Sequence, residues 1–411
     1  MDYHIIKTCD VALWGVPQVE RIRKVLAKAG DFNEIVDINV LSFEQNILIL
    51  RADYLYEANV LQKLVTCPEA VLLSSGQQPS PAAVWCSSNK VTHAINLLDQ
   101  GLPVSELNEI TVYTPEQLTG GYDPRLRKYD LAHVVQLNEN DKTVIENYLY
   151  DKSYKGITDL VTKWWWPLPA RGVVRMCANA KITPNMVTGF GWLLTIFSGF
   201  AFYYGELVAG LCAAWLMTFL DTVDGKLARV TLQSSKIGHA MDHGLDIIHP
   251  PIWYWCWAMG LGVSQIAFMN MTLPVMDWVW VMLAAYVGGR IFEGLFQLFF
   301  NDISIFCWKP IDSFHRLVTA RRNPCIILLS IAVLVADPEL GFMWVVAWSV
   351  ISTLLLASRF IFACVVRMVK GPLESWVENI DPHQSNAPLA VKLFTGYPAQ
   401  KTIAPLLRSV K

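Results

Sequence analysis

The sequence is poor in charge: 17% of its 411 residues are Asp, Glu, Lys or Arg, whereas 53% are hydrophobic and the mean hydropathy is +0.34. So apolar a chain is unusual for a soluble protein and predicts membrane-spanning segments. The net charge is −2, so the charge balance does not indicate a nucleic-acid partner. The length predicts two or three domains.

Paired cysteines and a leader segment are also lacking. The nine cysteines are scattered, and none forms a CxxC pair, which favours reduced thiols over disulfides or a cysteine metal cluster. The first ten residues, MDYHIIKTCD, contain no basic stretch followed by an apolar one. We therefore expect no cleaved signal peptide and a cytoplasmic N-terminus.

Residues 1–141 have the pattern of a cytoplasmic α/β domain. Helical periodicity covers 14–30 and 90–102, each ending at or beside a glycine. Short apolar stretches typical of buried strands occur at 33–40, 46–57, 69–75 and 82–86. Strands that alternate with helices favour a layered, mostly parallel sheet.

Residues 142–181 form a predicted connector. Its first part, KTVIENYLYDKSY, has helical character, and its second part carries Trp164 to Trp166 beside Arg171, Arg175 and Lys181. Tryptophans next to basic residues are typical of an amphipathic helix at the lipid headgroups. The alternative is that the tryptophans form an aromatic cluster in the protein core.

Residues 182–370 predict an all-α transmembrane domain of six helices, followed by a cytoplasmic tail at 371–411. The apolar segments run over 184–204, 207–227, 243–263, 273–299, 323–342 and 342–367. A helix needs about 20 apolar residues to cross the hydrocarbon. The fifth segment is the weakest of the six because Asp337, Pro338 and Glu339 interrupt it.

Loop charge predicts the orientation of these spans. Lys and Arg precede the first span, lie between the second and third and between the fourth and fifth, and follow the sixth. The intervening loops near 205, 264–272 and 336–341 contain no Lys or Arg. The positive-inside rule then places the basic loops, and both termini, on the cytoplasmic side.

Four aspartates lie at the junctions of the second and third spans. Asp221 and Asp224 are three residues apart, and Asp242 and Asp246 are four apart, so each pair projects from one helix face. Two carboxylates about 4 Å apart repel by roughly 4 kcal/mol at an effective dielectric near 20, so a cluster of four needs cations. Divalent ions such as Mg²⁺ take oxygen ligands and are often shared with substrate phosphates.

The residues between the aspartates fit a phosphate site. Gly225 and Gly238 allow close approach of a ligand or a helix, and Lys226 and Arg229 supply positive charge. The alternative is a salt-bridged helix end without catalytic function, which the fixed register of four aspartates disfavours. His239 and His243 are four residues apart. Beside hard carboxylates we expect them to form outer hydrogen bonds rather than a zinc site.

The pattern Asp221-x2-Asp224-Gly225-x2-Ala228-Arg229-x8-Gly238-x3-Asp242-x3-Asp246 resembles the signature of the CDP-alcohol phosphotransferase family at all eight defined positions. The segment ITPNMVT (182–188) resembles a second family element near the nucleotide. The resemblance implies a six-span membrane enzyme in which an acceptor hydroxyl attacks a CDP-linked donor and CMP leaves. It also implies a homodimer.

The resemblance also implies residue roles. Asp221, Asp224 and Asp242 would hold two Mg²⁺ or Mn²⁺ ions, and Asp246 would be the base that also contacts the second ion. The nucleotide pocket would comprise Gly225, Ala228, Arg229 and Gly238, with Lys226 and with Thr183, Pro184 and Asn185 of the second element.

A second basic cluster indicates the acceptor site. Arg290 and Glu293 lie inside the fourth predicted span, where a charged pair is a functional candidate, with mutual neutralisation as the alternative. The candidate acceptor-binding residues are Arg290, Arg316, Arg321, Arg322 and Arg359. Several arginines beside a metal-phosphate site favour an acceptor that is phosphorylated or a lipid headgroup. The alternative is the positive-inside signal with lipid phosphate contacts.

Residues 14–61 resemble sugar-phosphate nucleotidyltransferases, with Asp53 at the position of their metal-binding aspartate. The glycine-rich phosphate loop of those enzymes is absent, because IIKTCDVALWG takes its place. We therefore predict a degenerate domain that docks, dimerises or binds a ligand. An active cytidylyltransferase is the alternative, and TDLVTKWWWPLPAR and ARRNP resemble fused enzymes that make inositol phosphodiesters.

These observations predict an integral membrane transferase that moves a phospho-alcohol or phosphatidyl group from a CDP-linked donor to a hydroxyl acceptor in phospholipid or headgroup synthesis. One rival is a membrane-anchored cytidylyltransferase, or a bifunctional enzyme with both activities. A second rival is a non-catalytic scaffold, which the presence of every expected polar residue disfavours. The identities of the donor and acceptor stay open.

Overall fold

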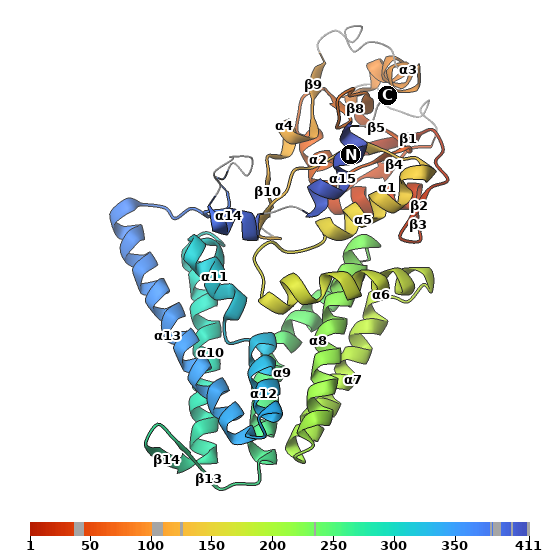
Figure 1. The fold of residues 1–411 in the computed structure, drawn as a ribbon. Coiled ribbons are helices and arrows are strands. Elements are labelled where there is room, and N and C mark those ends of the chain that lie inside the picture. Colours follow the sequence, from red (N-terminus) through yellow and green to blue (C-terminus); the bar gives the residue numbers. More distant parts are fainter. Residues whose placement is uncertain are drawn as a thin grey trace.

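The computed structural model describes residues 1–36, 45–100, 110–123, 126–233, 236–378, 380, 388–395 and 398–408, with the backbone alone at 122, 236–243, 245, 398 and 400. An α/β region lies at one end of the molecule, and a bundle of long helices extends from it (Figure 1). The N-terminus and the last described helix of the chain lie in the α/β region (Figure 1). The predicted succession of an α/β part and a helical part is confirmed.

The α/β region is built on a six-stranded sheet of order β4-β1-β5-β8-β7-β9. Its strands are β1 (Asp2–Ile6), β4 (Asn33–Glu34), β5 (Asn46–Arg51), β7 (Ala70–Leu73), β8 (Pro81–Ser87) and β9 (Thr111–Tyr113). Side chains of β5 alternate between the two faces. Leu48 and Leu50 pack with α1 (Gln18–Ala29) and α2 (Ala58–Leu64). Ile47 and Ile49 pack with α3 (Val91–Gln100), so helices cover both faces of the sheet.

The predicted helices at 14–30 and 90–102 are confirmed as α1 and α3, and β5, β7 and β8 confirm three of the predicted strands. The strand predicted at 33–40 corresponds to β4, and residues 37–40 lie outside the described residues. Strand β1 is not among those predicted.

The sheet is mostly parallel, as predicted, but one strand is reversed. β1 pairs in parallel with β4 and β5, and β7 with β9, but β8 is antiparallel to both β5 and β7. The reason is the short loop between β7 and β8, which the Ser74 amide closes by donating to the Ser80 carbonyl at 2.8 Å. So short a loop allows only a hairpin, whereas a parallel crossover needs a dozen or more residues.

Seven long elements form the helical region: α7 (Pro184–Tyr203), α8 (Leu207–Val230), α9 (Lys236–Gly260), α10 (Val275–Phe299), α11 (Pro310–Val318), α12 (Arg322–Leu334) and α13 (Pro338–Lys370). Among the described residues, α7, α8, α10 and α13 are long and apolar enough to cross a membrane, or five spans exist if α11 and α12, bent by 46°, form one. The third predicted span corresponds to α9, which carries Asp242, Asp246 and two prolines and is not among them.

The predicted boundary between the fifth and sixth spans at residue 342 is wrong. Helix α12 ends at Leu334, and α13 begins at Pro338. Ala336 takes a positive φ of 58°, which breaks the helix. Asp337 then caps α13 by accepting the Leu340 amide at 3.0 Å, and Pro338 occupies the first turn, where proline is favoured.

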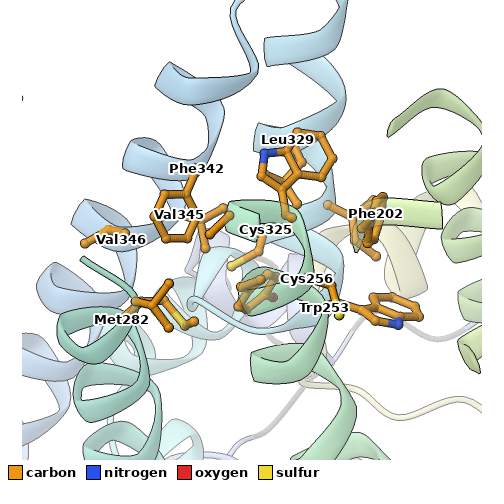
Figure 2. Packing of buried hydrophobic residues seen from close by; sticks show 14 of the residues in the cluster. Phe202, Trp253, Cys256, Met282, Cys325, Leu329, Phe342, Val345 and Val346 are labelled. Carbon is orange, nitrogen blue, oxygen red and sulfur yellow. The ribbon is translucent and has the colours of Figure 1, made fainter. Parts of the chain in front are cut away.

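Apolar side chains of the bundle point both inward and outward. A continuous core joins Phe202 of α7, Trp253 of α9, Met282 of α10, Leu329 of α12 and Phe342 of α13 (Figure 2). On the outer face, α7 leaves large side chains more than half exposed, namely Phe190, Leu193, Ile196, Phe197 and Phe200. Such faces are costly in water and stable in lipid, so the bundle is that of an integral membrane protein.

The connector contains α5 (Lys142–Lys152), a π-helical turn (Val161–Trp165) and α6 (Pro167–Asn179). Trp166 packs against Trp215 and Phe219 of α8, with ring centroids 6.0 and 5.1 Å apart. Trp164 and Trp165 are 51% and 52% exposed. Trp166 thus belongs to an aromatic cluster, whereas Trp164 and Trp165 are exposed. Contact of these two with lipid headgroups stays a prediction.

The C-terminal tail returns to the α/β region. Its helix α15 (Pro398–Arg408) packs on α5, where the Thr402 hydroxyl donates to Asp151 at 2.8 Å. Shorter elements complete the described chain: β2 (Ala12–Leu13), β3 (Val16–Pro17), β6 (Tyr54–Leu55), α4 (Pro115–Thr119), β10 (Tyr122–Asp123), β11 (Lys128–Tyr129), β12 (Val135–Gln136), β13 (Gln265–Phe268), β14 (Met271–Pro274) and α14 (Leu389–Phe394).

Candidate active site

Helices α7 and α8 approach closely, and small residues permit it. The Ser198 hydroxyl donates to the Gly210 carbonyl across the pair at 2.8 Å. A Cβ atom at Gly210 would lie 2.4 Å from the Phe202 ring, so a larger residue there would separate the helices. This contact fixes the facing side chains further along both helices.

Asp221 and Asp224 occupy one face of α8, as their spacing predicts. Asp224 is 7% exposed, and its Oδ2 accepts a hydrogen bond from the Thr188 hydroxyl of α7 at 2.6 Å. Both aspartates line a cavity of about 10 Å³ together with Thr188. A cavity of this volume has room for about one water molecule or one bare ion.

Asp246 of α9 lies beside this face. Arg322, the first residue of α12, bridges the two helices: its Nη2 donates to Asp221 Oδ2 at 2.6 Å and its Nη1 to Asp246 Oδ1 at 2.8 Å. The Asp246 side chain is 44% exposed, which leaves it accessible to a ligand. The structure thus brings together carboxylates that lie 25 residues apart in the sequence, as the difference between 246 and 221 shows.

The fourth aspartate falls in the backbone-only part of α9. The side chains of Asp242, His239 and His243, and the surroundings of Gly238, therefore lie outside the described residues. Among the described side chains, no three His, Cys, Asp or Glu residues converge on one point, and that set does not include Asp242. The donor set of Asp221, Asp224 and the Thr188 hydroxyl around an ion-sized cavity fits a hard divalent cation.

The glycine at 225 makes room for an arginine. A Cβ atom at Gly225 would lie 3.0 Å from Nη2 of Arg229, one turn further along α8. The guanidinium therefore lies over the bare backbone at Gly225, with half-buried Ala228 on the same turn. Glycine is therefore needed at position 225 because a side chain there would occupy the space of the Arg229 guanidinium. A bound ligand would be a second reason.

The second sequence element starts α7. Thr183 caps the helix by accepting the Met186 amide at 3.4 Å, Pro184 follows at the first helical position, and Asn185 is exposed. Thr188, one turn after Pro184, contacts Asp224. Thr188 lies within the ITPNMVT element, but the sequence alone does not mark it as a site residue, because only the packing of α7 on α8 reveals its contact with Asp224.

Lys226 points away from the aspartates. It is 3% exposed, its Nζ donates to the Ser153 carbonyl at 3.1 Å, and it lies 3.0 Å from the centroid of the Tyr154 ring. Both partners belong to the end of the connector helix α5 and the residues after it. These contacts place the Lys226 ammonium against the connector, and the predicted contact of Lys226 with a phosphate stays a prediction.

The candidate acceptor arginines have three different sets of contacts. Arg290 and Arg321 both pair with Glu293 in the bundle. Arg316 and Arg321 both lie over the Phe306 ring, at 5.5 and 5.4 Å. Arg316 is 8% exposed, and its Nε and Nη1 have no hydrogen-bond partner in the described part of the chain. These three arginines form what we call the arginine cluster.

Arg359 lies outside the arginine cluster as its contacts define it. Its Nε and Nη2 donate to Asp312 at 2.5 and 2.9 Å, and its guanidinium lies 4.5 Å from the Trp308 ring centroid. A bidentate ion pair with a buried carboxylate is a self-contained structural contact. The third set is that of Arg322, which contacts Asp221 and Asp246.

The connector is tied to the start of α12 beside Arg322. Asp159 accepts the Asn323 side-chain amide at 2.9 Å and the backbone amides of Val161 and Thr162, both at 3.1 Å. Burial would raise the pKa of Asp159, but the Arg316 charge and these hydrogen bonds outweigh it and lower the pKa. This contact links the TDLVT and ARRNP stretches, which the sequence shows as separate motifs.

In the α/β region, Asp53 has dedicated partners. Arg51 donates to its two carboxylate oxygens at 2.9 and 2.6 Å, and the Gln136 side chain donates to it at 3.0 Å. Burial alone would raise the pKa of Asp53, but the hydrogen bonds from Arg51 and Gln136 lower it. The lone pairs that a metal would use are therefore engaged by the protein itself.

Comparison with known proteins gives a family match within the helical region. Residues 181–355 match the sequence profile described as CDP-alcohol phosphatidyltransferase. Residues 181–355 are therefore similar to CDP-alcohol phosphatidyltransferases, which confirms the resemblance noted from the aspartate pattern.

Three relatives illustrate the range of the family. The chain is 37% identical over 79 residues to an archaetidylinositol phosphate synthase of Pyrococcus horikoshii, which covers 19% of this chain and 42% of that protein. It is 34% identical over 137 residues to a bifunctional IPC transferase and DIPP synthase of Thermococcus kodakarensis, over 33% of this chain and 29% of that protein. It is 30% identical over 126 residues to choline/ethanolaminephosphotransferase 2 of Arabidopsis thaliana, over 28% of this chain and 30% of that protein. Each match spans less than half of the relative.

Proposed function

We propose that the protein is an integral membrane CDP-alcohol phosphotransferase that transfers a phospho-alcohol or phosphatidyl group to an acceptor hydroxyl and releases CMP. The observation that carries the proposal is the position of Asp221, which shares Arg322 with Asp246 and lines the ion-sized cavity together with Asp224. The matched family profile over 181–355 supports the reaction class. The names of the relatives place such reactions in lipid and headgroup synthesis.

Asp221, Asp224 and Asp242 would hold Mg²⁺ or Mn²⁺, with Asp246 as a shared ligand and two ions in all. Bound divalent cations neutralise phosphate oxygens and stabilise charge on the leaving group. Thr188 holds the Asp224 carboxylate in one orientation through its 2.6 Å hydrogen bond. Gly225, Ala228, Arg229 and Gly238 would form the nucleotide pocket on the adjoining turns, with Thr183, Pro184 and Asn185 at the start of α7.

Asp246 would be the general base. A new bond forms between the acceptor oxygen and the β-phosphorus of the donor, and the bond from that phosphorus to the CMP oxygen breaks. CMP leaves with the electron pair, and the hydroxyl proton passes to a carboxylate oxygen of Asp246. The exposure of Asp246 and its contact with Arg322 support this role, because they give an accessible and oriented carboxylate.

The arginine cluster supports an acceptor that carries a phosphate. Arg290 and Arg321 both pair with a single carboxylate, Glu293. Arg316 lies over the same ring as Arg321 and keeps two buried donors without a hydrogen-bond partner in the described part of the chain. Buried unsatisfied donors are costly, and an anion that accepts from them removes the cost. We propose a phosphorylated polar alcohol or lipid headgroup at this position, with Arg322 between this cluster and the aspartates.

The proposed topology has six spans. Helix α9 supplies the third and the bent pair α11–α12 supplies the fifth, in addition to the four long apolar helices. The basic residues at the α/β end of the bundle support a cytoplasmic location of both termini and of the site. A homodimer is part of the proposal through family resemblance, and native mass spectrometry in detergent measures it.

For the α/β region we propose a nucleotidyltransferase-like but non-catalytic domain. Asp53 is engaged by Arg51 and Gln136, and the segment after β1 is the β2–β3 hairpin rather than a glycine-rich phosphate loop. Both observations disfavour the membrane-anchored or bifunctional cytidylyltransferase.

The test uses purified protein, Mg²⁺ or Mn²⁺, and a panel of CDP-alcohols and acceptors, with CMP release and product mass as readouts. We expect CMP release that requires metal and acceptor and is abolished by Asp246→Asn. CTP consumption that survives Asp246→Asn would instead support a cytidylyltransferase.

A further inference from the structure

The α/β region and the connector pack against one face of α8, at the end nearest the aspartates. Successive residues of an α-helix are rotated by about 100°. Val223, Lys226, Leu227 and Val230 therefore share one face, opposite to that of Asp221 and Asp224. The side chains on this second face are all buried against the α/β region and the connector.

Arg21 holds the last turn of α8. It lies on α1 of the α/β region, is 4% exposed, and its Nη1 donates to the Val230 carbonyl at 2.7 Å. The last four carbonyls of a helix have no partner within it, so this bond caps α8. Burial lowers the pKa of Arg21 to about 10, so the guanidinium still carries its charge at neutral pH.

Trp14 packs against the turn of α8 that precedes this capped end. It lies at the tip of the β2–β3 hairpin, is 2% exposed, and packs in one cluster with Val223, Leu227 and Val230. Its backbone and indole N–H groups donate to Glu146 of α5 at 2.8 and 3.0 Å. Gly15 follows with a φ of 73°, and a Cβ atom there would lie 3.2 Å from the Ala178 carbonyl, so the tight tip needs glycine.

We infer that the contacts of Arg21 and Trp14 with α8, which we call the α8 clamp, position Asp221 and Asp224. The α/β region would then act as a positioning module for the membrane site. The segment that follows the first strand of the α/β region thus forms part of the contact that fixes the helix. Val230 is nine residues beyond Asp221, as the numbering shows. Because helix ends fray, an unheld α8 would loosen toward the two aspartates. The inference rests on the proposed function in that these aspartates are taken to bind metal.

The experiment measures Mn²⁺ binding to the full-length protein in lipid nanodiscs by electron paramagnetic resonance, with Mn²⁺ alone as the probe. Arg21→Ala removes the cap, and we expect about tenfold weaker Mn²⁺ binding, the ratio that corresponds to one charged hydrogen bond. Arg21→Lys keeps a charged donor and should recover most of the affinity. Arg23→Ala is the matched control, because Arg23 lies on the same helix and pairs with Glu34 at the surface.

The kinetic signature separates positioning from general destabilisation. In Arg21→Ala the metal concentration for half-maximal CMP release should rise about tenfold, while the rate at saturating metal stays within about twofold of the wild type. A loss of folded protein would lower the saturating rate and leave the half-maximal concentration unchanged.

Three outcomes overturn the inference or its basis. Equal Mn²⁺ affinity of the wild type and Arg21→Ala would overturn the clamp and leave the proposed function intact. A wild type that binds no Mn²⁺ would overturn the proposed metal site and the clamp with it. If Arg21→Ala does not fold, Trp14→Leu is the second variant, with an expected affinity loss of about threefold for a partial loss of the contact; unchanged affinity would overturn the clamp.

Discussion

The molecule holds aspartates in two different ways, and the difference separates a structural carboxylate from a site. In the α/β region, Arg51 gives two of its nitrogens to one carboxylate, Asp53, and Gln136 adds a third hydrogen bond. In the bundle, Arg322 divides its guanidinium between Asp221 and Asp246, and a threonine holds Asp224. Asp221 and Asp224 also border an ion-sized cavity.

The local charge pairing of an aspartate is therefore stronger evidence for or against metal binding than its resemblance to a metal ligand in sequence. Asp53 and the four aspartates of the bundle each occupy the metal-ligand position of a family that the sequence resembles. The Asp53 carboxylate is satisfied within its own domain. In the bundle, by contrast, Asp221 and Asp246 share one guanidinium, that of Arg322.

The largest expected effect comes from Asp246→Asn, which removes the proposed base without changing side-chain size. We expect CMP release to fall about 10³-fold, within the range of general base catalysis. Asp53→Asn is the matched change in the other region and should leave the rate within about twofold. Comparable losses in the two variants would contradict the distinction between the two regions.

Removal of one arginine of the cluster should separate acceptor from donor. Arg290→Ala is expected to raise the KM for a phosphorylated acceptor about tenfold or more, the scale of one charged hydrogen bond, with little change in the KM for the CDP-linked donor. Arg359→Ala is the control, because Arg359 pairs with Asp312. Steady-state kinetics with both substrates varied measure the effect, and equal losses on donor and acceptor would count against the acceptor assignment.

Thr188→Val tests the residue that connects α7 with Asp224. The change keeps the shape of the side chain and removes the hydroxyl that donates at 2.6 Å. We expect about tenfold weaker Mn²⁺ binding, because a hydrogen bond to a charged group contributes about 1.5–3 kcal/mol. Thr195→Val, further along α7 and bonded to its own helix at Gly191, is the control.

The smallest effect concerns stability. The pKa of Asp53 is lowered in the folded protein, so its ionised form stabilises the α/β region. The stabilisation is fully present above the unfolded pKa of about 3.9 and is lost as the pH falls through the lower folded value. Asp53→Asn should cost about 1–2 kcal/mol at pH 7, with a smaller difference from the wild type in acid. Thermal unfolding at several pH values measures it; a pH-independent difference would argue against the ion pair.

Local patterns predicted much of this architecture because they report local physics. The spacing of Asp221 and Asp224 gives a shared helix face without any knowledge of the fold. The break before Pro338 also has a local signal, because Asp337 is a helix cap and Pro338 a first-turn residue, but the apolar residues on both sides obscure it.

The remaining features depend on contacts between distant segments. Thr188 meets Asp224 only because small residues let α7 approach α8. Arg322 and Arg359 look alike in the sequence, and tertiary packing assigns one to the aspartates and the other to Asp312. The reversed direction of β8 follows from the tight turn between Ser74 and Ser80, which outweighs the tendency toward parallel pairing.

The most direct measurement is a crystal structure of the full-length protein with bound Mn²⁺, in which anomalous scattering locates the metal. Our account predicts Mn²⁺ between α8 and α9, with carboxylate oxygens of Asp221, Asp224, Asp242 and Asp246 as ligands. Strong Mn²⁺ peaks elsewhere, or none at these four side chains under conditions that support CMP release, would contradict it.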